Sequence, residues 1–199
     1  YGVSDMYTEW RDNYFYPEIT SDPFLFQAVM KMQFNKHNIL AKAGQFDIPE
    51  IEQEEIDLET VKDLDEKWAG YSEKFIRDMA SSDQPWFLYH GTRGCHFDNY
   101  PPDSFKGKSR AKYPFHDVLV EMDDIFGRLF RALEETGQLE NTLIFVTSDN
   151  GPEMESWPDS SYTPFRGSKG TTWEGGIRVP GIFYWKGMIE AGRESDGLF

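Results

Sequence analysis

The sequence has a single cysteine, Cys95, and no long apolar run. One cysteine excludes a disulfide within the chain and a cysteine-rich zinc site. No stretch approaches the roughly 18 apolar residues that a membrane-spanning helix needs. The first ten residues, YGVSDMYTEW, show neither a basic segment nor an apolar one, so no signal peptide is visible. We therefore expect no membrane partner.

Positive charge is also scarce. The 199 residues include 20 Lys and Arg against 35 Asp and Glu, a formal net charge of −15. An acidic surface opposes binding to nucleic acid, which needs positive potential, so we expect no nucleic-acid partner. An anionic substrate must instead be attracted by a local group of cations or by a metal. The hydrophobic share of 39% is sufficient for a packed core.

The chain is predicted to form one domain, residues 1–199. Residues 1–65 are predicted to be irregular and insert-like, with a short helix near 24–34 and an acidic, solvated stretch from 49 to 65. Apolar spacing predicts helices at 66–82 and 117–136, the second closed by Gly137. Apolar runs predict strands at 85–90, 142–147 and 181–185, with 142–147 covered on both faces. Residues 66–199 therefore form the α/β portion.

The first candidate site follows the strand predicted at 142–147. Asp149 and Asn150 stand side by side in Ser-Asp-Asn-Gly-Pro and offer two hard oxygen ligands, which suit Ca²⁺ or Mg²⁺. The same residues are also common in ordinary turns, so a plain strand-to-loop turn is the alternative.

The second and third candidates are Lys169 and His96. Lys169 lies in the glycine-rich segment RGSKGTTWEGGIRVP, and its ammonium suits a tetrahedral anion, although a solvated surface lysine is the alternative. His96 lies in GTRGCHFDNYP, after the strand predicted at 85–90, and could donate a proton to a leaving oxygen or be a structural histidine. Cys95 has no evident activating base, and we interpret it as an inert thiol.

Residues from about Pro85 to Asp196 resemble the later part of the sulfatase catalytic domain, which shares its architecture with alkaline phosphatases. The matching segments are PWFLY followed by His96, then TSDNG, PFRG with Lys169, and EGGIRVP. The resemblance implies a partial alkaline-phosphatase-like α/β sheet with helices packed on its faces. It further implies that Asp149 and Asn150 bind a divalent cation, usually Ca²⁺, and that Lys169 and His96 contact the sulfate, with His96 as a candidate proton donor.

Part of the family's site has no counterpart here. The nucleophile of the family is a formylglycine made within a Cys/Ser-x-Pro/Ala-x-Arg segment, and this chain contains none. The early metal carboxylates, Lys and His are absent too. We therefore expect a fragment of a sulfuric ester hydrolase that is inactive alone, acting in its complete form on a sulfated small molecule or glycan.

Two other functions remain open at this point. One is a phosphatase or phosphonate hydrolase of the same superfamily, and the other is a non-catalytic binding module derived from it. An incomplete sheet would expose an edge, so self-association is a further expectation. Family resemblance suggests a periplasmic, secreted or lysosomal location.

Overall fold

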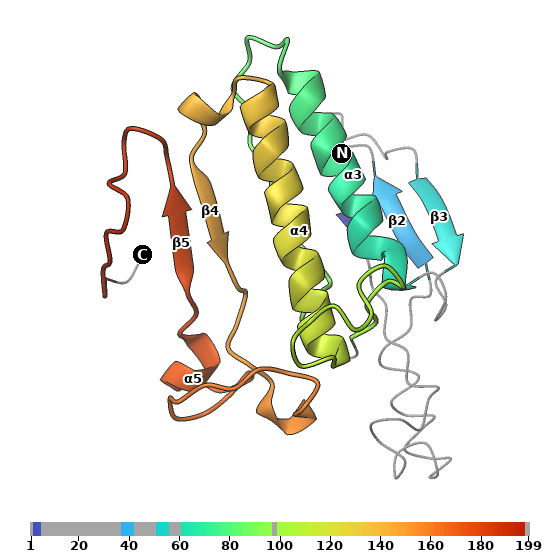
Figure 1. Ribbon diagram of the computed structural model, residues 1–199, viewed down its shortest axis with the longest axis vertical. Coiled ribbons are helices and arrows are strands. Elements are labelled where there is room, and N and C mark those ends of the chain that lie inside the picture. Colours follow the sequence, from blue (N-terminus) through green and yellow to red (C-terminus); the bar gives the residue numbers. More distant parts are fainter. Residues whose placement is uncertain (1, 5–36, 42–50, 56–60, 97–98, 198–199) are drawn as a thin grey trace. The chain divides into compact units, whose positions relative to one another are not determined.

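The computed structural model describes residues 2–4, 37–41, 51–55, 61–96 and 99–197 (Figure 1). The chain divides into two compact units. One comprises Tyr1–Trp68 and Gly91–Glu121, and the other comprises Ala69–His90 and Met122–Phe199. Chain segments alternate between the units, so the division does not coincide with the boundary predicted at residue 65.

The first unit contains a small antiparallel sheet in the order β1-β2-β3. Its strands are β1 (Gly2–Ser4), β2 (His37–Ala41) and β3 (Ile51–Glu55). The prediction that residues 1–65 are irregular is wrong for these three strands. Their hydrogen bonds come from pairing between segments that are distant in the sequence, which local patterns do not reveal. The helix predicted near 24–34 lies outside the described residues.

The two predicted helices are present. A short 3-10 turn, η1 (Val61–Asp63), leads into α3 (Leu64–Met79), and α4 spans Pro114–Glu135. Gly137 has a φ of 73° and donates its N–H to the carbonyl of Glu134, while the N–H of Gln138 reaches the carbonyl of Leu133. These two hydrogen bonds close the last turn of α4 as predicted, because glycine adopts the left-handed conformation without a Cβ clash.

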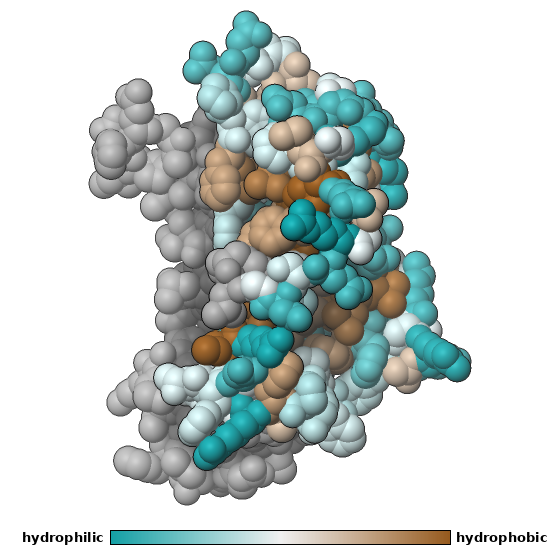
Figure 2. All heavy atoms as spheres, turned by 90° about the vertical axis from the view of Figure 1, so that its left-hand side faces the viewer, coloured by the Kyte–Doolittle hydropathy of each residue, from teal (hydrophilic) through white to brown (hydrophobic). Residues whose placement is uncertain are grey.

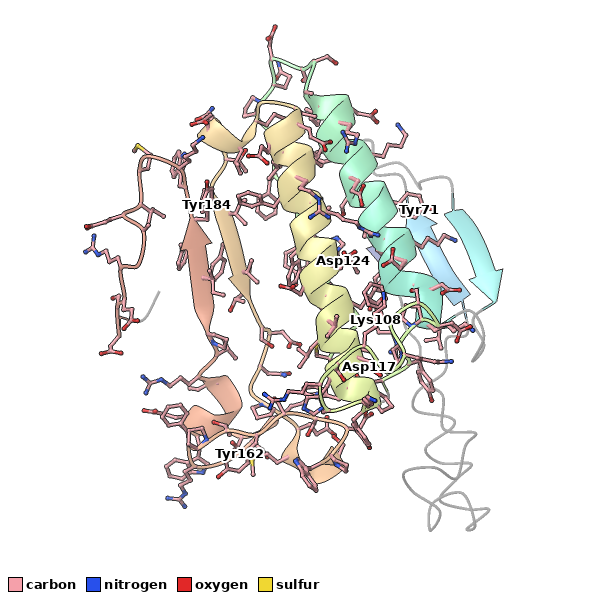
Figure 3. All side chains as sticks on the ribbon, viewed as in Figure 1. Tyr71, Lys108, Asp117, Asp124, Tyr162 and Tyr184 are labelled. Carbon is pink, nitrogen blue, oxygen red and sulfur yellow. The ribbon has the colours of Figure 1, made fainter. Side chains whose placement is uncertain are left out.

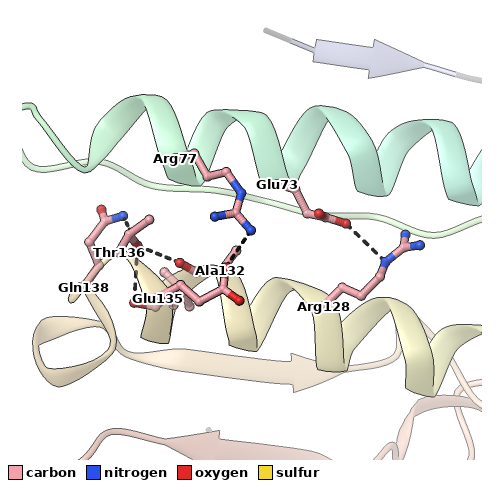
Figure 4. Close-up of polar contacts among 8 residues, drawn as sticks. Glu73, Arg77, Arg128, Ala132, Glu135, Thr136 and Gln138 are labelled. Atoms are coloured by element: carbon pink, nitrogen blue, oxygen red, sulfur yellow. Dashed lines mark hydrogen bonds and ion pairs between the residues drawn. The ribbon is translucent and has the colours of Figure 1, made fainter.

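Helices α3 and α4 run side by side in the same direction (Figure 4). Two ion pairs join them: Arg77 to Glu135 at 2.8 Å, and Arg128 to Glu73 at 3.1 Å. Beneath these pairs lies the core of the second unit, which comprises Ile76, Ala132, Leu133 and Leu139, with Trp86, Leu88, Leu129, Phe130, Ile144 and Tyr184 packed against it. Burial of these apolar side chains supplies most of the stabilisation, at about 1.5–3 kcal/mol for each large one.

The sheet of the second unit has two antiparallel strands, β4 (Ile144–Thr147) and β5 (Gly181–Tyr184). The short turn η2 (Leu139–Asn141) precedes β4, and η3 (Met154–Ser156) and the one-turn helix α5 (Glu174–Ile177) lie between the strands. The ring of Phe130 on α4 meets that of Tyr184 edge-on at 5.2 Å, so α4 covers one face of the sheet. Tyr184 is labelled in Figure 3.

Two strand predictions need correction. Residues 85–90 form no strand in the part of the chain that the structure describes: Trp86 and Leu88 pack on the core, whereas Phe87 and Tyr89 are 84% and 80% exposed. The residues alternate as in a strand, but β structure also requires a hydrogen-bonded neighbour. The strand at 142–147 is covered on one face, not two, because Leu143 and Phe145 are exposed.

Apolar side chains therefore reach the surface beside β5, as Figure 2 shows. On the uncovered face of the sheet, the rings of Phe145 and Phe183 stack at 4.4 Å. Among the described residues no helix has the length and apolar character to span a bilayer. Helices packed on a small sheet agree with the predicted partial α/β fold, and self-association through the sheet stays a prediction.

Candidate functional site

The end of β4 positions Asp149 and Asn150. Asp149 is exposed and Asn150 is half-buried. The side-chain amide of Asn150 donates to the carbonyl of Gly151 at 3.1 Å, and the hydroxyl of Ser148 donates to the carbonyl of Asn150 at 3.1 Å. These bonds fix the turn and use the Asn150 amide N–H, which leaves its amide oxygen and the Asp149 carboxylate as the acceptors of the pair.

The structure brings the Lys169 segment against this turn. The N–H of Lys169 donates to the carbonyl of Pro152 at 2.9 Å, and the N–H of Gly151 donates to the carbonyl of Gly176 at 2.9 Å. The strands explain this meeting, because antiparallel pairing sets Thr147, at the end of β4, opposite Gly181, at the start of β5. The loop that leaves β4 and the loop that enters β5 therefore lie at the same end of the sheet.

Glycines make this contact possible. A Cβ on Gly151 would stand 2.0 Å from the carbonyl oxygen of Gly175, and a Cβ on Gly175 would stand 2.1 Å from that of Gly167. Side chains larger than hydrogen do not fit at such separations. Gly151 and Gly175 therefore admit neighbouring backbone.

Sequence reasoning missed the partner of Lys169. The ammonium Nζ lies 3.1 Å from the carboxylate Oε2 of Glu153, and both side chains are partly buried. The two residues are sixteen positions apart in the sequence, and only the folding of the two loops reveals their contact. The sequence nevertheless offered a signal for Glu153 as a candidate site residue, since it follows Asp149 by four residues and stands in the same loop.

Further cations and aromatic rings lie close to Lys169 in the sequence. The guanidinium of Arg166 lies 3.8 Å from the ring centre of Trp173, and that of Arg178 lies 4.6 Å from the ring centre of Phe165. Such stacking helps to hold a cation in place, and Arg178 is also paired with Glu174 at 3.0 Å. Tyr162 is exposed in the loops below the sheet, where Figure 3 labels it. This end of the sheet thus combines cations with carboxylates, and two of its cations, Lys169 and Arg178, are ion-paired.

His96 belongs to the other unit. It is exposed and closes a short turn in which its N–H donates to the carbonyl of Arg93 at 3.2 Å. Two of the three predicted segments are therefore brought together, those of Asp149–Asn150 and Lys169. The convergence of His96 with them stays a prediction.

The neighbouring Cys95 does not have the character of a nucleophile. Burial, together with the negative charges of Asp65 and Glu121, raises the pKa of its thiol to about 12. A thiol with this pKa is protonated at neutral pH, and the thiolate is the reactive form. The structure supports the interpretation of Cys95 as inert. Glu121 is itself buried, with 2% of its surface exposed.

The donors at Asp149 and Asn150 fit a hard cation in type but not in number. Calcium takes six to eight oxygen ligands in proteins, and this pair supplies two side chains. Within the described part of the chain, no three His, Cys, Asp or Glu side chains gather so that they could hold a metal ion. These residues can therefore contribute to a Ca²⁺ or Mg²⁺ site only together with other ligands.

Comparison with known proteins decides the family. The Sulfatase family profile matches residues 2–198. The chain belongs to the sulfatase family. Human arylsulfatase A is 35% identical over 130 residues, which cover 65% of this chain and 25% of that protein. Rat N-acetylgalactosamine-6-sulfatase is 39% identical over 127 residues, covering 62% of this chain and 24% of that protein.

Solved structures agree with the assignment. The PsFucS1 sulfatase from Pseudoalteromonas sp. matches with a TM-score of 0.78 and 43% sequence identity, covering 89% of this chain and 35% of that one. Ps i-CgsB, solved with k-i-k-neocarrahexaose, matches with a TM-score of 0.62 at 19% identity, which shows a shared fold. The chain spans about a quarter of the length of the curated sulfatases that it matches.

Proposed function

We propose that this chain supplies the later half of the active site of a sulfuric ester hydrolase. Membership of the sulfatase family supports hydrolase chemistry at a coarse level. The observation that carries the finer proposal is the hydrogen bond from the backbone N–H of Lys169 to the carbonyl of Pro152 at 2.9 Å, because it holds Lys169 against the loop that begins at Asp149 and Asn150. The two loops thus combine one acid–amide pair with one cation.

Each residue has a role that suits cleavage of a sulfate ester. The reaction spreads negative charge over the sulfate oxygens and the leaving oxygen, so correctly placed positive groups lower its barrier. Lys169 binds a sulfate oxygen and stabilises the leaving oxygen, and His96 donates a proton to that oxygen. Asp149 and Asn150 contribute two ligands to a divalent cation, Ca²⁺ or Mg²⁺, which would add electrostatic stabilisation when bound.

The surroundings of Lys169 favour a sulfated glycan over other sulfate esters. Trp173 and Tyr162 are exposed, and the guanidinium of Arg166 stacks on the ring of Trp173. Flat rings can pack against the apolar face of a sugar while cations attract its sulfate groups. One similar protein, N-acetylgalactosamine-6-sulfatase, is named for a sugar. Another, Ps i-CgsB, was solved with k-i-k-neocarrahexaose.

A chimera tests the proposal. Residues 61–197 of this chain would replace the matching segment of the PsFucS1 sulfatase, whose remaining segments complete the domain. We expect the chimera to hydrolyse 4-nitrophenyl sulfate, and Lys169→Ala to reduce kcat by ~100-fold or more, as loss of an oxyanion-stabilising donor does. Lys186→Ala is the matched control, because Lys186 is a lysine paired with a glutamate, Glu140, elsewhere in the second unit.

Two results would count against the proposal. Faster hydrolysis of 4-nitrophenyl phosphate than of the sulfate would favour a phosphatase of the same superfamily. A folded chimera without activity toward either ester would favour a non-catalytic module. The unmodified chain, assayed alone, should show only background hydrolysis, because the family's formylglycine segment is not part of it.

A further inference from the structure

Asp65 is a buried carboxylate that binds the turn carrying His96. It is the second residue of α3 and is 6% exposed. One oxygen, Oδ1, accepts the backbone N–H of Arg93 at 2.7 Å, and the other, Oδ2, accepts that of Gly94 at 2.8 Å. Bonds from a charged acceptor to backbone N–H groups are shorter and stronger than neutral ones.

These two bonds are coupled to the backbone of His96. The N–H of His96 donates to the carbonyl of Arg93 at 3.2 Å. Asp65 therefore binds the backbone of the same residue, Arg93, that accepts the hydrogen bond from His96. Between them Cys95 has a φ of 73°, in the left-handed region that non-glycine residues rarely adopt. A turn with this unfavourable residue needs outside support, and Asp65 provides it from a helix.

We propose that Asp65 is a positioning residue for His96, holding the turn 93–96 in the geometry that presents the imidazole to the sulfate ester. This role rests on the proposed function of His96. Asp65 does not touch the substrate: it acts through the backbone of Arg93 and Gly94. A carboxylate on the first turn of a helix is well suited to the task, because the helix fixes its position and the positive end of the helix dipole stabilises its charge.

The same unit contains a matched control. Asp117 lies on the first turn of α4 (Figure 3). It accepts the N–H of Gly107 at 2.7 Å and that of Ser109 at 2.8 Å. Burial acts to raise the pKa of Asp117, but the hydrogen bonds from Ser109 and Gly107 outweigh it, and the pKa lies below its usual value. Asp117 thus repeats the arrangement of Asp65 on a turn that does not carry His96.

The first measurement is amide hydrogen exchange on the full chain. In Asp65→Asn one acceptor oxygen is replaced by an amide group that cannot accept either N–H, so we expect the His96 amide to exchange ~10-fold faster or more, as local opening becomes easier. Asp117→Asn should speed exchange at Gly107 and Ser109 and leave His96 unchanged. Asp65→Glu, which restores the charge, should recover part of the protection.

The second measurement is steady-state kinetics in the PsFucS1 chimera. We expect Asp65→Asn to lower kcat by ~10- to 100-fold with little change in KM, because a misplaced proton donor slows the chemical step more than binding. Asp65→Glu should regain part of the loss, and Asp117→Asn should keep kcat near that of the parent at temperatures where both variants are folded.

The outcomes separate the two proposals. An inactive parent chimera contradicts the proposed function, and the exchange experiment still decides whether Asp65 controls the turn. If His96 exchange does not respond to Asp65→Asn, or if kcat falls no further than in Asp117→Asn, the positioning role of Asp65 is wrong.

Discussion

The ammonium of Lys169 and the carboxylate of Glu153 form an ion pair at 3.1 Å across the two loops at the end of the β4–β5 sheet. Both side chains retain some contact with solvent, so the pair contributes about 1 kcal/mol or less. An anion that binds Lys169 must therefore compete with a weakly held internal partner. If Lys169 binds sulfate as proposed, Glu153 competes with the sulfate for its ammonium.

Replacing Glu153 by Gln should strengthen the binding of inorganic sulfate. The substitution keeps the shape of the side chain and removes one negative charge beside Lys169, so we expect the Kd for sulfate to fall by ~2- to 5-fold, the equivalent of a weak surface pair. NMR titration of the full chain with sodium sulfate measures this change. Glu140→Gln removes the same charge beside Lys186 and should have no effect, and a weaker affinity in Glu153→Gln would refute the competition.

Replacing Gly175 by Ala should distort the Lys169 loop. The added Cβ would stand 2.1 Å from the carbonyl oxygen of Gly167, and backbone atoms cannot move aside as a side chain can. We expect destabilisation of about 1–3 kcal/mol, the usual cost of overpacking, measured by urea denaturation. Gly70→Ala is the control, because among the described residues nothing beyond its own helix lies within 4 Å of its added Cβ, and alanine favours the helix. Equal stability of both variants would contradict the close packing.

Sequence patterns that extend over only a few residues predicted the helices and two of the strands. The apolar spacing of α3 and α4, the left-handed Gly137 and the apolar runs of β4 and β5 are all read within a few residues, and each was found. Residues 85–90 alternate in burial as a strand does, but a neighbour for hydrogen bonding is a property of the whole sheet. The exposed face at Phe145 has the same origin, because the sequence of a strand does not tell what lies opposite.

The candidate site shows the same limit. Asp149 and Lys169 were proposed from their motifs, and the structure brings their loops together. Glu153 and Asp65 were not identified, because their contacts join residues sixteen positions apart in one case and twenty-eight or more in the other. A carboxylate in an acidic sequence carries no mark of its partner, so such positioning contacts emerge only from the folded chain.

Calcium should bind this chain only weakly. Asp149 and Asn150 provide two side-chain ligands where six to eight oxygens are usual, so we expect no Kd below about 1 mM by isothermal titration calorimetry in dilute buffer. Asp149→Asn should leave the weak heat signal almost unchanged. Micromolar binding that disappears in Asp149→Asn would show that the chain completes a metal site by itself.

His90 should make the stability of the chain fall in mild acid. Its Nδ1 lies 2.8 Å from the hydroxyl oxygen of Ser72, and its Nε2 is buried without a hydrogen-bond partner among the described residues. Burial lowers the pKa of His90 from its ordinary value of 6.5, because a charged imidazolium would be poorly solvated there. The folded chain therefore takes up this proton at a lower pH than the unfolded chain does.

The stability due to neutral His90 is fully present above about pH 6.5 and is lost as the pH falls toward the lowered pKa. The loss approaches about 1.4 kcal/mol per pH unit between the two pKa values. Urea denaturation followed by tryptophan fluorescence at pH 5 to 7.5 should show this slope in the parent and a shallower one in His90→Asn, which keeps an atom near the position of Nδ1. His116→Asn, which changes an exposed histidine, should retain the slope of the parent, and parallel curves for His90→Asn and the parent would exclude His90 as its source.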